Sequence, residues 1–288
     1  MTAAYFTAAR REFHQSLFAN KTLTVSVAGV ASIADKDNET SRKISQSILV
    51  QLGMPEPQMK PPPQTAGAAF EMAVARFVKA AFGRCGHLRP GDWDTQCLGS
   101  ARRVAILSQF EPYSHLAALD QAIRANPELL TVLGNAYSIS PDVIVTRRPE
   151  PDEAINQYER LVDQAAATRT IIRAANQPLP ILHAVISCKL TLRSDRAQNA
   201  RSEALNLVRN RKGRLPHIAV VTAEPLPSRL ASLALGTGDI DCVYHAALDE
   251  LKVAVETVGN DDTRESLDQM VEGQRLRDIA DLPLDMTV

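Results

Sequence analysis

Apolar and polar residues alternate from His183 to Arg193 with the period of two that is typical of a half-buried strand. One predicted face is entirely apolar and consists of Ala184, Ile186, Cys188, Leu190 and Leu192. The other face carries Ser187, Lys189, Thr191 and Arg193. A turn at residues 193–196 then leads into an amphipathic helix that we expect to end near Asn210. The pattern therefore places an amine and a guanidinium along the polar face of a strand.

Predicted helices and strands alternate along most of the remaining chain. Helices are predicted at residues 5–18, 41–52, 67–82, 227–235, 246–258 and 263–279. Further strands are predicted at residues 140–147, 217–223 and 239–244. This alternation favours the α/β class, with helices packed on a central sheet. We see no internal repeat and no domain boundary, so residues 1–288 are expected to form a single domain.

Four segments have weaker patterns. Residues 54–67 contain five prolines, which predict neither a helix nor a central strand. This segment could be a domain linker or a loop that crosses a groove, and the pattern does not separate the two. Residues 84–93 are expected to be irregular, residues 100–133 mostly helical, and residues 151–174 a helix with a connecting loop.

Composition narrows the function classes only slightly. The chain has 288 residues, of which 45% are hydrophobic and 23% charged, as in an ordinary globular protein. Aromatic residues make up 5%, which argues against a stacking platform for single-stranded nucleic acid. The net charge is −1, but residues 189–214 contain eight basic residues against Asp195 and Glu203. This local excess of six positive charges fits a solvated surface or a nucleic-acid contact equally well.

The cysteine and histidine spacings indicate no metal cage. The four cysteines are far apart and form no CxxC pair, which predicts reduced thiols and a cytoplasmic location. The six histidines show no catalytic or ligand spacing, so we expect structural roles for them. The N-terminal residues lack the apolar core of a signal peptide, and no apolar run is as long as a membrane span.

Three separated residues suit metal-dependent phosphodiester cleavage. Asp142 starts a predicted strand, Lys189 lies on the polar face of another, and Glu203 follows fourteen residues later. Mg²⁺ prefers oxygen ligands such as carboxylates and backbone carbonyls. It activates the attacking water and neutralises charge on the phosphate, which a lysine also stabilises. With its side chain in the core, Cys188 would present its backbone carbonyl to the metal.

Glu71 is unusual because it lies on the apolar side of the helix predicted at residues 67–82. A buried carboxylate without a partner is costly. A salt bridge at the margin of the helix would explain it, and so would a place in an active site.

The positions of these residues resemble the PD…K…E motif of type II restriction endonucleases, within the group that recognises a CCGG core. The motif here consists of Pro141-Asp142, Ser187-Cys188-Lys189 and Glu203. Longer runs carry the same resemblance, namely Arg193–Glu203, Arg214–His217, Thr222–Pro225, Leu235–Gly238, Asp241–His245, Asp281–Asp285, His87–Trp93 and Asn126–Leu129. The similarity covers most of the chain and is weakest in the first sixty residues.

The resemblance implies a PD-(D/E)XK fold, a central mixed sheet flanked by helices, and Mg²⁺-dependent cleavage of double-stranded DNA to leave 5′-phosphate ends. It implies that Asp142, Glu203 and the Cys188 carbonyl bind the metal and that Lys189 acts at the scissile phosphate. Ser187 replaces the acidic residue that is usual two positions before the lysine. An acidic residue from an N-terminal helix joins the site in this group, which favours a catalytic role for Glu71.

The resemblance also implies which residues read the bases. Arg193, Asp195 and Arg196 are similar to the group's major-groove readers of CCGG, and their chemistry suits guanine O6 and N7 and cytosine N4. Flanking G·C recognition is implied for Asp35, Arg229 and, from the minor groove, Gln64. Asp37 stands where the group has serine, which bears on the outer base pair. The expected site is GCCGGC.

The implied assembly is a homotetramer of two dimers that binds two DNA sites, encoded beside a DNA methyltransferase that protects the same site. A single catalytic and DNA-recognition domain, residues 1–288, would carry both functions. Two other functions stay open: a catalytically silent DNA-binding protein, and a structure-specific nuclease for junctions or repair. The presence of Asp142, Lys189 and Glu203 argues against the first, and the arginine–aspartate reader argues against the second.

Overall fold

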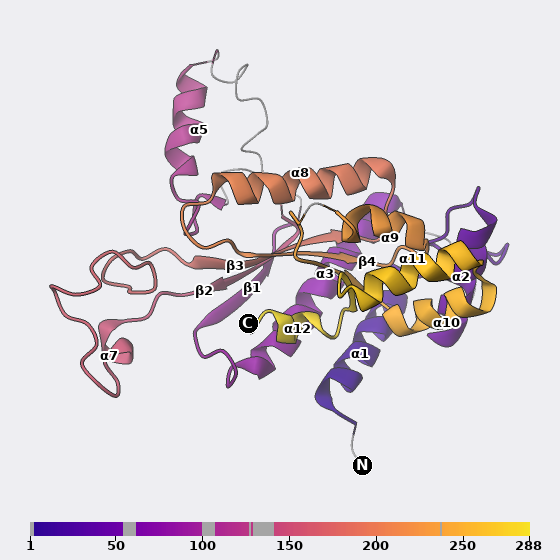
Figure 1. Ribbon diagram of the computed structural model, residues 1–288, viewed down its shortest axis with the longest axis horizontal. Coiled ribbons are helices and arrows are strands. Elements are labelled where there is room, and N and C mark those ends of the chain that lie inside the picture. The colour runs from indigo at the N-terminus through magenta and orange to yellow at the C-terminus, as the bar shows by residue number, and fades with distance from the viewer. Residues whose placement is uncertain (1–2, 54–61, 100–106, 127, 129–140, 237) are drawn as a thin grey trace.

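One six-stranded sheet lies at the centre of the molecule, with its strands in the order β1-β2-β3-β4-β5-β6 (Figure 1). The computed structural model describes residues 3–53, 62–99, 107–126, 128, 141–236 and 238–288. The strands are β1 Trp93–Cys97, β2 Val143–Arg147, β3 Ile181–Lys189, β4 His217–Thr222, β5 Cys242–His245 and β6 Leu276–Asp278. β2 is antiparallel to β1 and β3, whereas β3 to β6 are parallel. The predicted α/β class with a central mixed sheet is confirmed.

Helices cover both faces of this sheet. They are α1 Tyr5–Ala19, α2 Glu39–Gln51, α3 Pro63–Phe82, α5 Leu116–Ala125, α7 Asp152–Ile155, α8 Ser194–Asn210, α9 Pro227–Ala234, α10 Leu248–Val258, α11 Asp261–Glu272, α12 Leu282–Asp285 and the 3-10 turn η1 Gly83–Cys85. Figure 1 shows α8 along one face and α3 on the other. Across the described ranges, no helix has both the length and the apolar character to cross a membrane.

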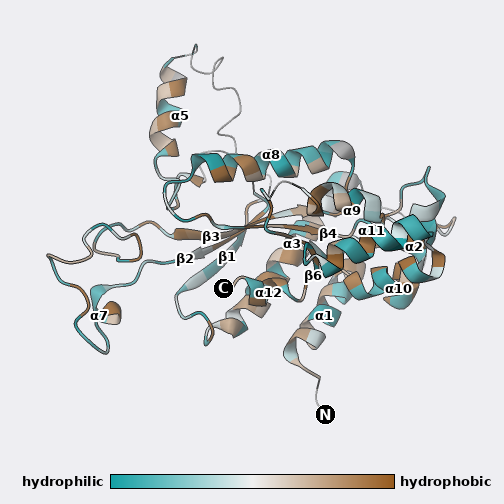
Figure 2. Ribbon diagram, viewed as in Figure 1, coloured by the Kyte–Doolittle hydropathy of each residue, from teal (hydrophilic) through white to brown (hydrophobic). Residues whose placement is uncertain are grey.

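Two apolar cores result, one on each face of the sheet. In β4, Ile218 and Val220 belong to one core, and Ala219 and Val221 belong to the other. Because side chains alternate along a strand, a strand buried on both faces has an almost continuous apolar sequence. Figure 2 shows the apolar colouring of the central strands and of the helix sides turned toward them.

The end of β3 differs from the prediction. The alternating pattern placed Leu190 and Leu192 in the strand, on the same face as Cys188, but β3 ends at Lys189. Leu192 packs in the opposite core from Cys188. The chain leaves the sheet because the Leu192 N–H donates to the Glu224 carboxylate, at 2.7 Å, instead of continuing the ladder.

Both edge strands were missed. β1 begins at Trp93, the last residue of the segment expected to be irregular, and residues 94–97 carried no prediction; its side chains are mostly half-buried. β6 occupies residues that the sequence assigned to a helix at 263–279. α11 instead ends at Glu272 and is followed by Gly273, where a Cβ atom would come within 2.7 Å of the Gln269 carbonyl oxygen. Short edge strands carry too few residues for a periodic pattern to stand out.

Predictions for the less regular segments were partly wrong. α3 begins at Pro63, inside the segment expected to exclude helix, because a proline is tolerated in the first turn, where its missing N–H has no helical partner. Between residues 100 and 133, α5 is the main described helix, and residues 100–106, 127 and 129–133 lie outside the described residues. Residues 54–61 and Ser140 also lie outside them.

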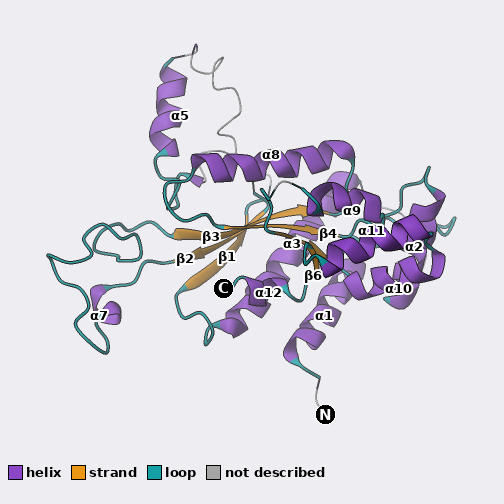
Figure 3. Ribbon diagram, viewed as in Figure 1, coloured by secondary structure: helices purple, strands orange, loops and turns teal. Residues whose placement is uncertain are grey.

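The connection between β2 and β3 forms an arm that extends from the sheet (Figure 3). Its only helix among the described residues is the four-residue α7, so the helix predicted within 151–174 is much shorter than expected. The Arg173 guanidinium holds the arm together by bonding to Asp152, with Nε 2.6 Å from Oδ1, and to the Ala166 carbonyl at 2.9 Å. Tyr158 and Leu161 remain 94% and 62% exposed on it.

Candidate active site

A cleft of about 430 Å³ opens where β3 ends and α8 begins. Its walls come from α3 on one face of the sheet and from α8 on the other. The lining residues are Ser32, Ala66, Gly67, Glu71, Cys188, Lys189, Leu190, Thr191, Arg193, Arg196, Asn199 and Glu203. In α/β sheets, ligands commonly bind beyond the carboxyl ends of the strands, which is where this cleft lies.

Asp142 lies beside the cleft, immediately before β2, and is completely buried. Its Oδ2 atom accepts a hydrogen bond from the Lys189 ammonium at 2.9 Å and from the Cys188 N–H at 2.7 Å. Both donors come from the end of β3, which pairs with β2. Burying a carboxylate is costly unless it is paired and hydrogen-bonded, and β3 supplies both. The sheet itself therefore fixes the aspartate and the lysine side by side.

Two further carboxylates line the same cleft from opposite layers. Glu71 extends from α3 and is 8% exposed, and Glu203 extends from α8 and is half-buried. They line one cleft because it lies at the end of β3, between α3 and α8. The structure thus brings together Asp142, Lys189 and the two glutamates, while their catalytic roles remain predictions.

Ser187 and Cys188 are both buried, and only Cys188 lines the cleft. Ser187 is 7% exposed, and its Oγ atom has no hydrogen-bond partner among the described residues. Cys188 packs its side chain into a core, as expected. Burial, together with the negative charge of Asp142, raises the pKa of the Cys188 thiol well above its usual value. A raised pKa disfavours the thiolate, which is the nucleophilic form of cysteine.

The carboxylates do not form a ready-made metal cage. Within the part of the chain that the structure describes, no three His, Cys, Asp or Glu side chains are grouped to hold an ion. Mg²⁺ does not require such a cage, because it commonly binds through one or two carboxylates, with water and substrate phosphate as the other ligands. The buried Asp142 and the nearby Glu203 supply donors of this type, so the residues present fit a magnesium ion.

Arginines lie at the rim of the cleft, where α8 begins. Arg193 precedes the first helical residue and is exposed, as is Asp195. Arg196 is half-buried, and its Nη1 atom donates to the Thr191 carbonyl at 3.3 Å and hydroxyl at 3.2 Å. These charges begin within four residues of Lys189, so the predicted readers lie directly beside the predicted cutting residues.

The predicted outer readers also meet. Arg229, on α9, forms an ion pair with Asp35, which is 194 residues away in sequence. The pKa of Asp35 is lowered mainly by its hydrogen bond with Arg229, then by the Asp37 N–H, and further by the charge of Arg193. Gln64 is exposed on the first turn of α3 and does not line the cleft.

The sequence analysis missed one residue of this region, Glu224. It is fully buried after β4 and accepts hydrogen bonds from the Leu192 N–H at 2.7 Å and the Leu226 N–H at 3.2 Å. Its Oε1 atom lies 3.8 Å from Arg229 Nη1. The Thr222–Pro225 run belonged to the resemblance, but a single glutamate after an apolar strand carries no periodic signal of its own.

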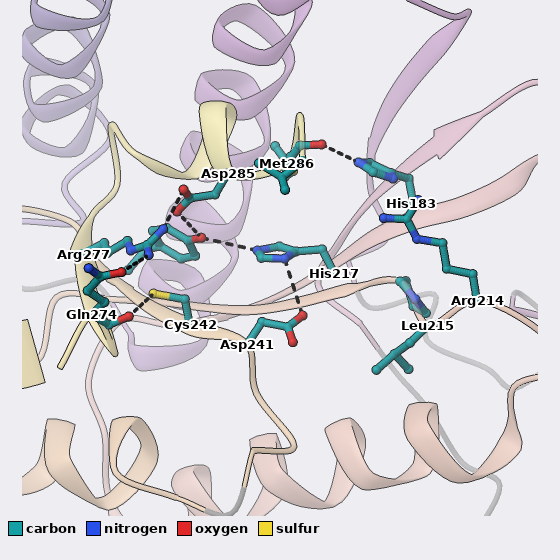
Figure 4. A pocket seen from close by; sticks show the side chains of 13 residues that line it. His183, Arg214, Leu215, His217, Asp241, Cys242, Gln274, Arg277, Asp285 and Met286 are labelled. Atoms are coloured by element: carbon teal, nitrogen blue, oxygen red, sulfur yellow. Dashed lines mark hydrogen bonds and ion pairs between the residues drawn. The ribbon is translucent and has the colours of Figure 1, made fainter. Parts of the chain in front are cut away.

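A second cleft, at the opposite ends of the parallel strands, is a poorer candidate (Figure 4). Its polar groups pair with one another. The Tyr244 hydroxyl donates to Asp285 at 2.8 Å, and the Arg277 guanidinium also bonds to Asp285, at 2.6 Å. His183 contacts the Met286 carbonyl at 2.7 Å, and burial lowers the pKa of His183 to about 4. These contacts fasten the last helix to the sheet.

Comparisons with known proteins agree with the resemblance carried by the motif. A family model described as the NgoMIV restriction enzyme matches residues 13–288. The type II restriction enzyme NgoMIV of Neisseria gonorrhoeae is 51% identical over 283 residues, which cover 98% of this chain and 99% of that protein. Bse634I, a type IIF restriction endonuclease solved with cognate DNA, aligns over 91% of both chains, with 13% identity and a TM-score of 0.27. The chain described above belongs to the NgoMIV family of type II restriction enzymes.

Proposed function

We propose that this protein is a Mg²⁺-dependent, site-specific endodeoxyribonuclease that cuts double-stranded DNA at the palindrome GCCGGC and leaves 5′-phosphate ends. The observation that carries the proposal is the buried Asp142 carboxylate, bonded to Lys189 at 2.9 Å beside a cleft that Glu71 and Glu203 also line. Three carboxylates would repel a phosphate by themselves. With one lysine and a bound divalent cation, their negative charge is offset and the phosphate can bind.

We assign the metal to Asp142, Glu203 and the backbone carbonyl of Cys188. When bound, Mg²⁺ supplies positive charge against the phosphate and makes water a better nucleophile. Asp142 is held in place for this by the Cys188 N–H at 2.7 Å. Glu71 completes the acidic set from α3, and Ser187 occupies the position two residues before the lysine.

Lys189 stabilises negative charge that develops on the scissile phosphate. Its ammonium is bonded to Asp142, and its side chain is 15% exposed, so it can face both the carboxylate and an incoming phosphate. In a site with little water, a fixed positive charge is worth more than it is in bulk solvent. The lysine needs no proton transfer to act in this way.

Base recognition would come from the rim of the cleft. Arg193 and Arg196 suit the O6 and N7 acceptors of guanine, and Asp195 suits the N4 donor of cytosine in the CCGG core. We assign the outer G·C pair to Asp35 and Arg229 in the major groove, with Gln64 in the minor groove. A single domain would then both read and cut, because both sets of residues surround one end of one sheet.

We propose a homotetramer of two dimers that engages two DNA sites. A twofold dimer matches a palindromic target. The exposed Tyr158 and Leu161 on the arm between β2 and β3 provide an apolar surface that another copy can cover. A cognate DNA methyltransferase is the expected partner in the cell. Without methylation of its own GCCGGC sites, the host genome would be cut by the enzyme.

Removing the metal should abolish cleavage. Chelation with EDTA leaves the Asp142, Glu71 and Glu203 carboxylates facing the phosphate without the positive charge that offsets them. We expect no product from a GCCGGC duplex in EDTA and full recovery when excess Mg²⁺ is added, as measured by gel electrophoresis of a labelled duplex. Cleavage that continues at the same rate in EDTA would contradict the assignment.

Three DNA substrates separate the proposed function from its alternatives. A linear duplex with one GCCGGC, the same duplex with a scrambled site, and a four-way junction are each incubated with the full chain and Mg²⁺. Cleavage of only the first supports the proposal. Specific binding of the first without cleavage would identify a silent DNA-binding protein, and cleavage of only the junction would identify a structure-specific nuclease.

A further inference from the structure

Glu224 connects two segments that the proposed function uses for different base pairs. Its Oε2 atom accepts from the N–H of Leu192, the residue immediately before Arg193. Its Oε1 atom accepts from the N–H of Leu226, the residue immediately before α9, which carries Arg229. One buried carboxylate therefore fixes the start of both reading segments.

The same carboxylate also orients the Arg229 side chain. Arg229 directs its Nη1 atom to Glu224 at 3.8 Å and its Nη2 atom to Asp35. A guanidinium held at two nitrogens has a fixed plane, and bidentate recognition of guanine depends on that plane. The charge of Arg193 also lowers the pKa of Asp35, by less than the contact with Arg229 does.

We propose that Glu224 is a positioning residue that holds Arg193 and Arg229 in a fixed register, so that the CCGG core and the flanking base pair are read as one unit. This inference rests on the proposed function. Glu224 is completely buried and cannot touch DNA itself. Glu224 acts through the two arginines, whereas the cleft residues are proposed to contact the DNA or the metal directly.

The charge state of Glu224 should control this function. Burial raises the pKa of Glu224 to about 7. The Leu192 and Leu226 N–H groups and the charge of Arg229 lower this pKa, and the charge of Asp35 raises it further. A further titratable neighbour is His245, whose Nε2 atom contacts the Glu224 carbonyl at 3.2 Å, and burial lowers the pKa of His245 to about 4. Protonation puts an O–H donor opposite the N–H donors and removes the charge that faces Arg229.

The test compares cleavage of GCCGGC with cleavage of ACCGGT, which differs only in the outer base pair. The Glu224→Gln variant places an NH₂ group opposite the N–H donors and so imitates the protonated state. We expect it to lower the ratio of kcat/KM values for the two duplexes at least tenfold at pH 8. The wild-type ratio should fall toward the variant's as the pH drops from 8 to 6, while the variant's ratio stays constant.

Glu272→Gln, at an exposed glutamate at the end of α11, is the matched control and should keep the wild-type ratio. An equal loss of rate on both duplexes, or an unchanged ratio in a variant that still cuts, would overturn the inference. Should Glu224→Gln fail to fold, Glu224→Asp takes its place, because the shorter carboxylate does not span the Leu192 and Leu226 N–H groups in the same way, and an unchanged ratio in that variant rejects the role. A wild-type protein that does not distinguish the two duplexes would instead overturn the proposed function.

Discussion

Replacing Lys189 with alanine should lower the rate of cleavage at GCCGGC by about 10²-fold to 10³-fold, the cost expected for losing a main stabiliser of transition-state charge. Binding to the same duplex should stay specific, because Arg193 and Arg196 are unchanged. Single-turnover cleavage and gel-shift titration of one labelled duplex measure the two effects separately. Loss of specific binding together with cleavage would show that Lys189 supports the fold or the DNA contact and not the chemistry.

The substitution also removes the ammonium from a buried ion pair. Breaking such a pair typically costs about 3 kcal/mol or more, so Lys189→Ala should lower the free energy of unfolding by that order. The double variant Asp142→Asn, Lys189→Ala neutralises the stranded carboxylate and keeps an acceptor for the Cys188 N–H. It should recover at least half of the lost stability in urea unfolding and none of the cleavage. Recovery of cleavage in the double variant would contradict the role of both residues.

Replacing Arg193 with alanine should remove sequence discrimination rather than catalysis. A bidentate arginine–guanine contact is worth about 1–3 kcal/mol, and a palindrome contains each contact twice, so the expected loss is about 2–6 kcal/mol. This corresponds to a fall in specific over non-specific affinity of about 30-fold to 10⁴-fold. Competition binding between GCCGGC and a scrambled duplex at one fixed salt concentration measures it.

Two variants show whether geometry or charge is responsible. Arg193→Lys keeps the charge and loses the planar fork, so it should lose most of the discrimination as well. Arg209→Ala removes an exposed arginine from the last turn of α8 and should weaken binding to both duplexes equally. If Arg193→Ala keeps the wild-type ratio of specific to non-specific affinity, other residues recognise the CCGG core.

The sequence predicted the interior of the fold better than its edges. β3 was found because its sequence alternates with the strand period, and β4 because it is a short, continuous apolar run. β1 and β6 are short and lie at the edges of the sheet, so tertiary pairing and not the local pattern determines them. The exact end of β3 could not be predicted, because it depends on Glu224, a hydrogen-bond acceptor 32 residues later in the chain.

The candidate site was predictable to a different degree for each residue. The spacing of Asp142 and Lys189 on two predicted strands suggested their meeting, and the structure pairs them at 2.9 Å. The placement of Glu71 beside Glu203 depends on how two helix layers meet at the end of the sheet, which only the resemblance could indicate. Asp35 and Arg229 were named for the same base pair, but their ion pair across 194 residues follows from packing alone.

The most direct test of the central claim is to digest a random-sequence plasmid library with the full chain and Mg²⁺, and then to sequence every new end. We predict that the ends fall within one palindrome with a CCGG core, that GCCGGC accounts for nearly all of them, and that each carries a 5′-phosphate. Ends scattered without a shared sequence, or no ends at all from protein that binds GCCGGC specifically, would contradict the account.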